Sequence, residues 1–440
     1  MEHDSIARRR PRQHDGRSTA ELAVFAATEQ LLQESSLRDI TVAKILSRAK
    51  LSRANFYHYF ASKYDVIAAM VARMVEGIDA GEGPLRAELS ATRKPVMEAD
   101  LRHAIDIWSE HSALICAVIE HIHVVPQLAA AWNLMLDRFV STLVEQINRE
   151  READAAPGGA AAEMIATVLV CGYERCFYVG ARSYDSRLPD PDAAVDSIIE
   201  LTFAAIYGDR SQVSRAPRRR KRLPQSRQSA GSETRTAGTG SPAPTHGGGD
   251  PDTMAAILRA TSELLGKHSM DQLSVANILE RADISRATFY FYFGSKDDVF
   301  LALFHAIVDG VVSRFSRLAD IDRADPEQIK SVVTHTLDLD PESFGVLRNA
   351  VHEWPHRPQL RQAYLATMSQ VIGSLETAIE SDRAAGLALE GPPAPQLAAA
   401  IMWTVERTIA GSLAGEAHLE DTAAIAGFLG DLLIATVYTR

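Results

Sequence analysis

The chain of 440 residues is 46% hydrophobic and 23% charged, a composition typical of a soluble globular protein with two or three domains. It has no uninterrupted apolar run of about 18 residues, and its Arg-rich start lacks the apolar core of a secretory signal, so we expect neither a membrane span nor secretion. Cys116, Cys171 and Cys176 offer no disulfide framework, and we expect them to be buried thiols in a cytoplasmic protein.

The net charge of −11 argues by itself against a nucleic-acid binder, because phosphate contacts require Lys and Arg. The charge is unevenly distributed, however: residues 1–66 carry eleven basic and eight acidic residues, and residues 209–249 carry nine and two. These stretches contain the basic runs 8–12 and 218–222. Each run is interpreted either as an arm that lies in a DNA minor groove or as a solvated tail.

An internal repeat organises the chain. Residues 41–66 read TVAKILSRAKLSRANFYHYFASKYDV and residues 274–299 read SVANILERADISRATFYFYFGSKDDV, with 17 of 26 positions identical at a shift of 233. Downstream, Glu174-Arg175 corresponds to Glu406-Arg407 at a shift of 232, and Tyr207 corresponds to Tyr438 at a shift of 231. A repeat of this extent indicates two whole domains rather than one shared motif.

The repeat predicts six parts of the chain. The stretch between the copies is basic at first and then rich in Gly, Pro, Ser and Thr, so we expect a disordered linker there. The expected parts are a basic arm over 1–17, a helix-turn-helix over 18–66, a helical ligand and dimerisation bundle over 67–208, the linker over 209–250, a second helix-turn-helix over 251–299 and a second bundle over 300–440.

The hydrophobic pattern predicts helices throughout. In the first helix, Val24/Phe25, Thr28 and Leu31/Leu32 recur at helical spacing, and residues 257–265 repeat the pattern. No convincing run of alternating β-branched residues occurs, so the predicted class is all-α. After the helix-turn-helix, the helices expected in copy one cover 63–79, 95–110, 112–123, 126–152, 160–182 and 191–207, with matching segments in copy two.

The repeated 26 residues have the pattern of a DNA-reading helix-turn-helix. Thr41 and Ser274 are suited to cap a short helix that ends at residue 49 or 282. A tight turn follows, and Ser52 or Ser285 then begins a second helix. Its length, its cap and the preceding turn are typical of a recognition helix.

The second helix divides into a buried face and a reading face. Phe56 and Phe60, like Phe289 and Phe293, lie four residues apart and should face inward. Arg and Asn can read base edges, Tyr hydroxyls suit phosphates, and the Ser-Lys pair that opens the next helix offers a phosphate clamp. In copy one the predicted DNA-contacting residues are Thr41, Ser52, Arg53, Asn55, Tyr57, His58, Tyr59 and Lys63. In copy two they are Ser274, Ser285, Arg286, Thr288, Tyr290, Phe291, Tyr292 and Lys296.

The pattern A-x-[LI]-S-R-A-x-F-Y-x-Y-F-x-S-K resembles the DNA-binding domain of TetR-type transcriptional repressors. FYFYFGSK in copy two is similar to the actinobacterial branch of that family containing the ethionamide-resistance regulator. The resemblance is strong over residues 20–70 and 253–303 and weaker over the bundles. It implies two tandem domains, each with a three-helix reading head and a ligand-binding bundle, packed through the last bundle helices as an intramolecular pseudo-dimer. It also implies that a bound ligand changes the spacing of the recognition helices and releases the operator.

One position departs from the family pattern. The turn between the two helices usually carries Gly, which adopts positive φ without cost, whereas this chain has Lys50 and Asp283. Asp tolerates this conformation better than Lys. The turn is therefore expected to be modestly strained, or to have a different shape in copy one.

The second head is the more acidic one, because residues 250–299 carry five basic and eight acidic residues. Asp283, Asp297 and Asp298 create an unfavourable field for phosphate. We therefore expect a ligand-responsive repressor with two non-identical or unequally bound half-sites. The alternative is a ligand-sensing or protein-interaction protein with one degenerate DNA-binding head. The sequence leaves open whether the protein is a repressor or an activator, and whether two chains associate.

The sequence does not indicate an enzyme or a cofactor. His111, His121 and His123 lie near Glu120, but His121 and His123 are two apart and diverge on a helix, so no metal site is expected. Cys171 and Cys176 fit no metal spacing. No nucleophile elbow, phosphate loop or paired-carboxylate pattern occurs.

Aromatic and polar residues of the bundles are candidates for a pocket that takes a small apolar or amphiphilic effector, with core packing as the alternative. In copy one they are His103, Trp108, Trp132, Tyr173 and Tyr178. In copy two they are His335, Phe344, Trp354, Tyr364 and Trp403.

Ala-rich segments over 160–181 and 193–207, and over 396–414 and 421–438, are the candidates for the dimer-type helices. Small residues allow helices to approach closely. Glu174-Arg175 and Glu406-Arg407 lie on these segments, either as paired charges between the halves or as ion pairs within one half.

Overall fold

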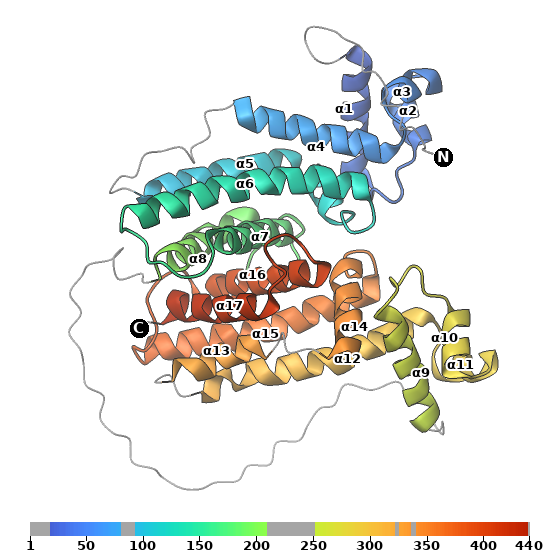
Figure 1. The fold of residues 1–440 in the computed structure, drawn as a ribbon. Coiled ribbons are helices and arrows are strands. Elements are labelled where there is room, and N and C mark those ends of the chain that lie inside the picture. Colours follow the sequence, from blue (N-terminus) through green and yellow to red (C-terminus); the bar gives the residue numbers. More distant parts are fainter. Residues whose placement is uncertain (1–17, 81–92, 209–250, 322–324, 336–339, 439–440) are drawn as a thin grey trace.

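The computed structural model describes residues 18–80, 93–208, 251–321, 325–335 and 340–438 (Figure 1). These residues are helical with short connections, and their only β features are two isolated bridges, so the predicted all-α class is confirmed. The basic runs 8–12 and 218–222 and the linker 209–250 lie outside the described residues. We call residues 18–208 half one and residues 251–438 half two.

Half one begins with a three-helix head and continues into a bundle. The first turn of the head is held by a capping box at Ser18, whose hydroxyl accepts from the Glu21 N–H while Glu21 accepts from the Ser18 N–H. The helices are α1 (Thr19–Glu34), α2 (Val42–Ala49), α3 (Arg53–Tyr59), α4 (Lys63–Ala80), α5 (Arg93–Ile119), α6 (Pro126–Glu152), α7 (Ala162–Ala181), the 3₁₀ turn η2 (Pro191–Ala194) and α8 (Val195–Tyr207).

The predicted helices 95–110 and 112–123 differ from the structure in their boundaries. They form one helix, α5, with a kink at His111, whose φ of −115° and ψ of 17° are not helical. The helix ends at Ile119, and residues 120–124 form turns rather than the last turn of the predicted helix. The predicted break therefore coincides with a kink.

Half two repeats the order of the α-helices of half one, with one difference. The region that corresponds to α5 consists of two helices, α13 and α14. The helices of half two are α9 (Pro251–Leu265), α10 (Val275–Ala282), α11 (Arg286–Tyr292), α12 (Lys296–Phe315), the 3₁₀ turn η4 (Ser316–Asp320), α13 (Pro326–Thr334), α14 (Pro341–Glu353), α15 (Pro358–Ala384), α16 (Ala394–Ala414) and α17 (Thr422–Val437).

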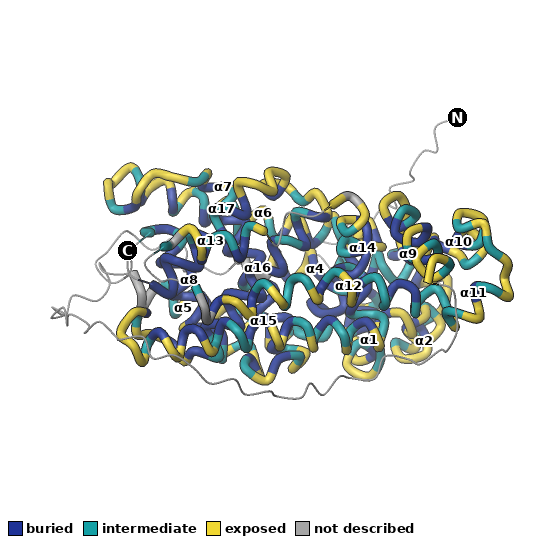
Figure 2. Tube along the Cα trace, turned by 90° about the horizontal axis from the view of Figure 1, so that it is seen from below, coloured by how far each residue is buried: buried dark blue, intermediate teal, exposed yellow. Residues whose placement is uncertain are grey.

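The two halves meet through their last helices, as predicted. α7 packs on α16 and α8 packs on α17, so four helices form the centre of the molecule between the outer layers (Figure 1). One cluster of buried side chains runs through both halves. Both heads lie at the same end of this bundle, and the short helices α2 and α10–α11 are largely exposed (Figure 2). The fold therefore presents two reading heads on one rigid support.

Two described segments, Ala162–Ala181 and Lys296–Leu318, are long and apolar enough to cross a membrane by length and composition alone. The first is α7, which is 83% buried, so its apolar surface is explained by packing between the halves. The second is 28% buried and packs on α9, α14 and α15. Two such helices are weak evidence for a membrane span, because the core helix of a globular protein meets the same criterion.

Candidate nucleic-acid interface

The four predicted helix caps are present in the structure. Thr41 Oγ1 accepts from the Lys44 N–H at 3.3 Å, and Ser274 Oγ accepts from the Asn277 N–H at 3.2 Å. On the second helices, Ser52 Oγ accepts from the Asn55 N–H at 3.2 Å and Ser285 Oγ from the Thr288 N–H at 3.0 Å. Since a free N-terminal N–H needs such a partner, these hydroxyls fix where α2, α3, α10 and α11 begin.

The turn between the two helices is the same in both heads. Lys50 has φ 55° and ψ 42°, and Asp283 has φ 53° and ψ 50°, so both lie in the left-handed region. Of the two expectations for this turn, the different shape in copy one is wrong. The conformation is one that Gly adopts freely and that costs Lys more than Asp.

Buried Phe residues orient the recognition helices. Phe56 and Phe289 are fully buried, and Phe60 packs on Phe56 and Phe25 with ring centroids 5.7 Å apart in both pairs. Phe293, predicted to be core, is only half-buried. The opposite face of each helix is exposed. It carries Arg53, Asn55, Tyr57 and His58 in α3, and Arg286, Tyr290 and Phe291 with the half-buried Thr288 in α11.

Tyr59 and Tyr292 lie less favourably for DNA than predicted. Both side chains are half-buried and pack against the core of the head. The Tyr59 ring also meets the His58 ring edge-on, with centroids 4.9 Å apart.

Lys63 and Lys296 point inward rather than toward a phosphate. The Lys63 ammonium donates to the carbonyl oxygens of Leu37 at 2.6 Å and Ile40 at 2.8 Å, and burial lowers its pKa. Lys296 donates in the same way to the carbonyls of Met270 and Leu273 at 2.8 and 2.6 Å. These lysines fasten the loop between the first two helices to the start of the fourth. At the start of α4, the Asp65 carboxylate and the Ser62 hydroxyl accept from the N–H groups of Ala61, Ser62 and Asp65, so these groups of the expected phosphate clamp are also engaged within the protein.

The acidic field of the second head is weaker than its charge count indicates. Arg357, at the end of the α14–α15 connection, forms ion pairs with Asp297 and with Asp271, the latter at 2.7 Å. The Asp298 carboxylate accepts from the Ser295 hydroxyl at 3.0 Å. The negative charge of Asp297 is therefore partly compensated within the protein, and the Asp298 carboxylate has a neutral hydrogen-bond donor.

The joint between head and bundle is tightly closed in half two. Asn349 of α14 accepts from the Met270 N–H at 2.8 Å and donates to the carbonyls of Leu265 and His268, both at 3.3 Å. Gly345 lies directly on Gly266, where an added Cβ would meet the Gly266 Cα at 2.6 Å. Three hydrogen bonds and a close backbone contact thus hold this head in place.

The joint of half one is open. A cavity of about 600 Å³ lies between α1, α4 and α5. Its lining includes the apolar residues Phe25, Met70 and Met74 as well as Glu29 and His111, whose side chains approach to 3.8 Å. Sequence reasoning placed only His103 of this lining in a pocket. The half-one position equivalent to Asn349, at the shift of 232, is Ala117 of α5, which has no side chain that can make such hydrogen bonds.

The other predicted pocket residues do not line one cavity. Trp132, Tyr178, Trp354, Tyr364 and Trp403 are buried in the core, as the alternative reading held. Trp108 is buried against Phe177, and the Tyr173 hydroxyl lies 2.5 Å from the Thr202 hydroxyl. His335 and Phe344 are exposed. Among the residues that the structure describes, no group of three or more His, Cys, Asp or Glu is arranged to hold a metal ion.

Comparisons with known proteins identify the family. The sequence model of bacterial regulatory proteins of the tetR family matches residues 24–70 and 257–303, and that of the C-terminal domain of the transcriptional regulator EthR matches residues 97–208 and 341–439. The HTH-type transcriptional regulator EthR of Mycolicibacterium smegmatis is 31% identical over 169 residues, which cover 38% of this chain and 76% of that protein. The chain belongs to the TetR family.

A further relative agrees with this assignment. EthR of Mycobacterium tuberculosis strain H37Rv is 26% identical over 43% of this chain and 88% of that protein. Among solved structures, a SmeT–triclosan complex covers 43% of this chain and 93% of its own chain, with 20% identity and a TM-score of 0.37. The relatives are transcriptional regulators rather than enzymes. This TetR-family protein is accordingly a DNA-binding regulator in tandem form, as predicted.

In this TetR-family chain, the contact between the halves is centred on buried charges. Arg407 donates to Glu174 at 3.1 Å, and Arg175 lies 2.9 Å from Glu406. All four side chains are at most 7% exposed. Of the two readings of these charges, the pairing between halves is correct. Trp132 donates to Glu174 at 3.2 Å and Tyr364 to Glu406 at 2.5 Å, so each carboxylate has a second partner in its own half.

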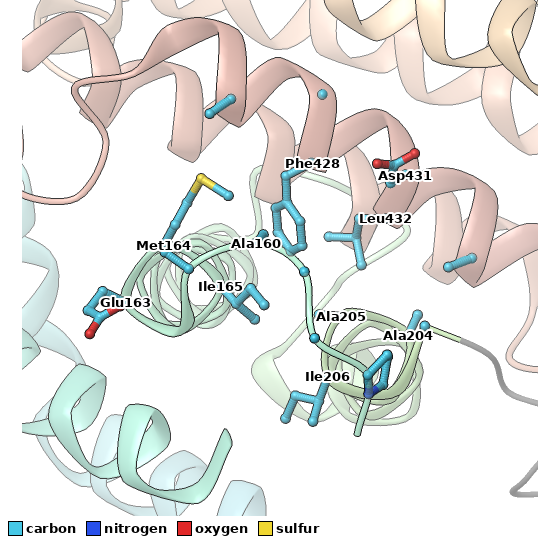
Figure 3. Close-up of a pocket in the computed structure, with 18 of the residues that line it drawn as sticks. Ala160, Glu163, Met164, Ile165, Ala204, Ala205, Ile206, Phe428, Asp431 and Leu432 are labelled. Carbon is cyan, nitrogen blue, oxygen red and sulfur yellow. The ribbon is translucent and has the colours of Figure 1, made fainter. Parts of the chain in front are cut away.

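At the far end of the bundle from the heads, a groove of about 930 Å³ opens between the halves (Figure 3). Met164 and Ile165 at the start of α7 and Ile206 of α8 face Phe428 and Leu432 of α17. Sequence reasoning missed this groove. No local pattern could have indicated it, because it exists only where the two halves meet.

Proposed function

We propose that the chain is a cytoplasmic, ligand-responsive repressor that binds one operator with two unlike reading helices, α3 and α11. The observation that supports this is the pair of exposed recognition faces, held at the same end of one bundle and carrying different side chains (Figure 1). The operator then needs two half-sites about one helical turn apart, as for dimeric helix-turn-helix proteins.

The face of α3 suits purines. Asn55 can bond adenine through its N6 and N7 atoms, and Arg53 can bond guanine through O6 and N7. Tyr57, which is 44% exposed, can reach a phosphate or the edge of a base. The first half-site is therefore proposed to depend on hydrogen bonds to one adenine or guanine.

The face of α11 suits thymine. Phe291 replaces His58 and is 54% exposed, which is unusual for a side chain of this kind unless it meets an apolar partner. The methyl group of thymine in the major groove is such a partner. Arg286 and Tyr290 correspond to Arg53 and Tyr57, so the backbone contacts and the guanine contact can be shared by both heads.

The test measures binding of the protein to DNA from its own promoter region, by fluorescence anisotropy at several salt concentrations. Arg53→Ala and Arg286→Ala should each weaken specific binding by about 1–3 kcal/mol, roughly tenfold to hundredfold. Arg149→Ala, on the exposed side of α6 far from the heads, is the matched control and should change nothing. Unaltered binding by both head variants would contradict the proposal.

The second candidate function is a sensor with one degenerate head, which the net negative charge of residues 250–299 favours. A footprint of the bound promoter separates the two. Protection of two adjacent major grooves supports two working heads. Protection of a single groove that Arg53→Ala abolishes and Arg286→Ala leaves intact supports the sensor.

The effector is proposed to be a small amphiphilic molecule that enters the open joint of half one. The support is a lining that combines apolar side chains such as Met70 and Met74 with charged side chains such as Arg73 and Glu110. The test screens a panel of amphiphiles for compounds that raise the unfolding temperature of the protein. Met74→Trp should fill the cavity and remove the rise in unfolding temperature that such a compound causes. Met368→Trp, on α15 of half two, serves as the control.

A further inference from the structure

Gly172 of α7 and Thr404 of α16 are equivalent positions that touch each other. They are 232 residues apart, the same shift as between Glu174 and Glu406. A Cβ added to Gly172 would lie 2.5 Å from the Thr404 Oγ1 and 3.1 Å from its Cβ. Two equivalent residues can be in contact only near the axis that relates the halves. This contact therefore marks the pseudo-twofold axis.

From this contact we infer that the interface favours the pairing of half one with half two, and that it rejects the pairing of two copies of half two. In a pair of half two, Thr404 would face a second Thr404. Each Thr404 side chain would then need space that is free in the mixed pair only because Gly172 has no side chain. In a pair of half one, two Gly residues would face each other and leave a void in a buried site, which costs packing energy. Shape at a single point thus distinguishes the three pairings.

A second contact also favours the mixed pair of half one and half two. Trp403, next to Thr404 and 1% exposed, donates its indole N–H to the Asp185 carboxylate of half one at 3.1 Å. The position equivalent to Trp403 in half one is Cys171. In a pair of half one, the buried Asp185 would lose this donor, and a buried carboxylate with a missing partner is costly.

A third contact lies further from the axis. Arg187 of half one donates to Glu376 of α15 at 2.7 Å. In half one the position equivalent to Glu376 is Val144. A pair of half one would place the half-buried Arg187 beside an aliphatic side chain in place of a carboxylate.

The central ion pairs do not discriminate. Glu174 and Glu406 are equivalent, as are Arg175 and Arg407, so two ion pairs would form in any combination of halves. They supply attraction common to all pairings. The choice of partner then depends on Gly172–Thr404, Trp403–Asp185 and Arg187–Glu376.

The experiment starts from the intact chain with a protease site inserted into the segment 209–250 and cut after folding. The nicked protein is unfolded in urea, refolded and weighed by native mass spectrometry. The expected result is the mixed pair of one half one and one half two, with pairs of half two absent. Pairs of half two at the proportion of random association would overturn the inference.

Two variants test the shape directly. Thr404→Gly should make pairs of half two appear in the nicked protein, and Thr261→Gly, a buried helical Thr in the second head, should not. In the uncut chain, Gly172→Thr should lower the unfolding temperature, and adding Thr404→Gly should restore most of the loss. Absence of rescue in the double variant, or an unchanged pairing pattern with Thr404→Gly, would also overturn it.

Discussion

At the scale of single residues, Lys50 and Asp283 make the tight turn of each head without the usual Gly. Both have φ between 53° and 55°. The left-handed conformation costs an L-residue roughly 1–2 kcal/mol, and less for Asp because its short side chain can bond locally. The turn is therefore kept although it is a source of local strain.

Replacing Lys50 by Gly should stabilise the protein by up to about 1 kcal/mol, because the gain in the turn exceeds the entropy that Gly adds to the unfolded chain. Asp283→Gly should gain less. Calorimetric unfolding of both variants measures this difference. If Lys50→Gly lowered the unfolding temperature, the positive φ at this position would be refuted.

Lys63 offers a second prediction, because its ammonium bonds carbonyls rather than facing solvent. Lys63→Met should cost about 1–3 kcal/mol of stability, since it leaves the carbonyls of Leu37 and Ile40 without their donor. Lys296→Met should act in the same way in the second head. The expected signature is loss of stability in the absence of DNA, measured by urea unfolding. An unchanged stability with weaker operator binding would instead favour the phosphate clamp.

At the scale of elements, the two heads are joined to their bundles differently. Asn349 ties α14 to the segment that follows α9, and Ala117 provides no such group in half one. The cavity between α1, α4 and α5 lies at the joint that lacks the clamp. If the proposed effector binds in this cavity, the first head is the one that it would move at lower cost.

Asn349→Ala should release the second head. The three hydrogen bonds to the second head are lost, and the Met270 N–H becomes a buried donor without a partner, at a cost of about 1–3 kcal/mol. Hydrogen exchange over residues 265–273 should become faster, while residues 31–40 in the first head stay unchanged and serve as an internal reference. Unchanged exchange over 265–273 would show that Asn349 does not hold the joint.

How much of the structure can be predicted from the sequence depends on how far apart in the chain the interacting residues lie. Caps such as Ser52 and the buried Phe56 were predictable, because each depends on residues three or four positions away. The Asn349 clamp joins residues about eighty positions apart and has no local pattern. The inward direction of Lys63 was missed for the same reason, because its partners lie more than twenty residues away. Most of the pocket candidates were aromatic residues that the core uses for packing.

At the scale of the whole molecule, the halves also meet near the heads through histidines. The His121 and His356 rings lie 4.9 Å apart, and those of His123 and His352 lie 3.7 Å apart. Burial, followed by nearby Arg charges, lowers the pKa of His352 and His356 to about 4 from 6.5. His352 Nδ1 is buried without a hydrogen-bond partner. The folded protein therefore holds these rings neutral.

Acid should accordingly weaken the contact between the halves. The unfolded chain binds protons at these histidines below pH 6.5, and the folded chain binds them only near pH 4. The stability that the neutral rings contribute is therefore fully present above pH 6.5, and it is lost as the pH falls from 6.5 toward 4. The unfolding temperature measured from pH 7.5 to 4.5 checks this. His352→Gln should flatten the profile, whereas the exposed His335→Gln should reproduce the wild-type curve. Parallel profiles for all three proteins would rule out His352 as a source of the dependence.

The Gly172–Thr404 contact has a consequence for how such a chain can change over time. Once the two copies of a duplicated domain differ in bulk at the axis, a single change that lets one copy pair with its own kind also spoils the fit between the halves of the fused chain. Bulk added at Gly172 collides with Thr404, and bulk removed from Thr404 leaves a void beside Gly172. The fusion is thereby locked in, and the two heads are left free to drift toward different DNA sequences.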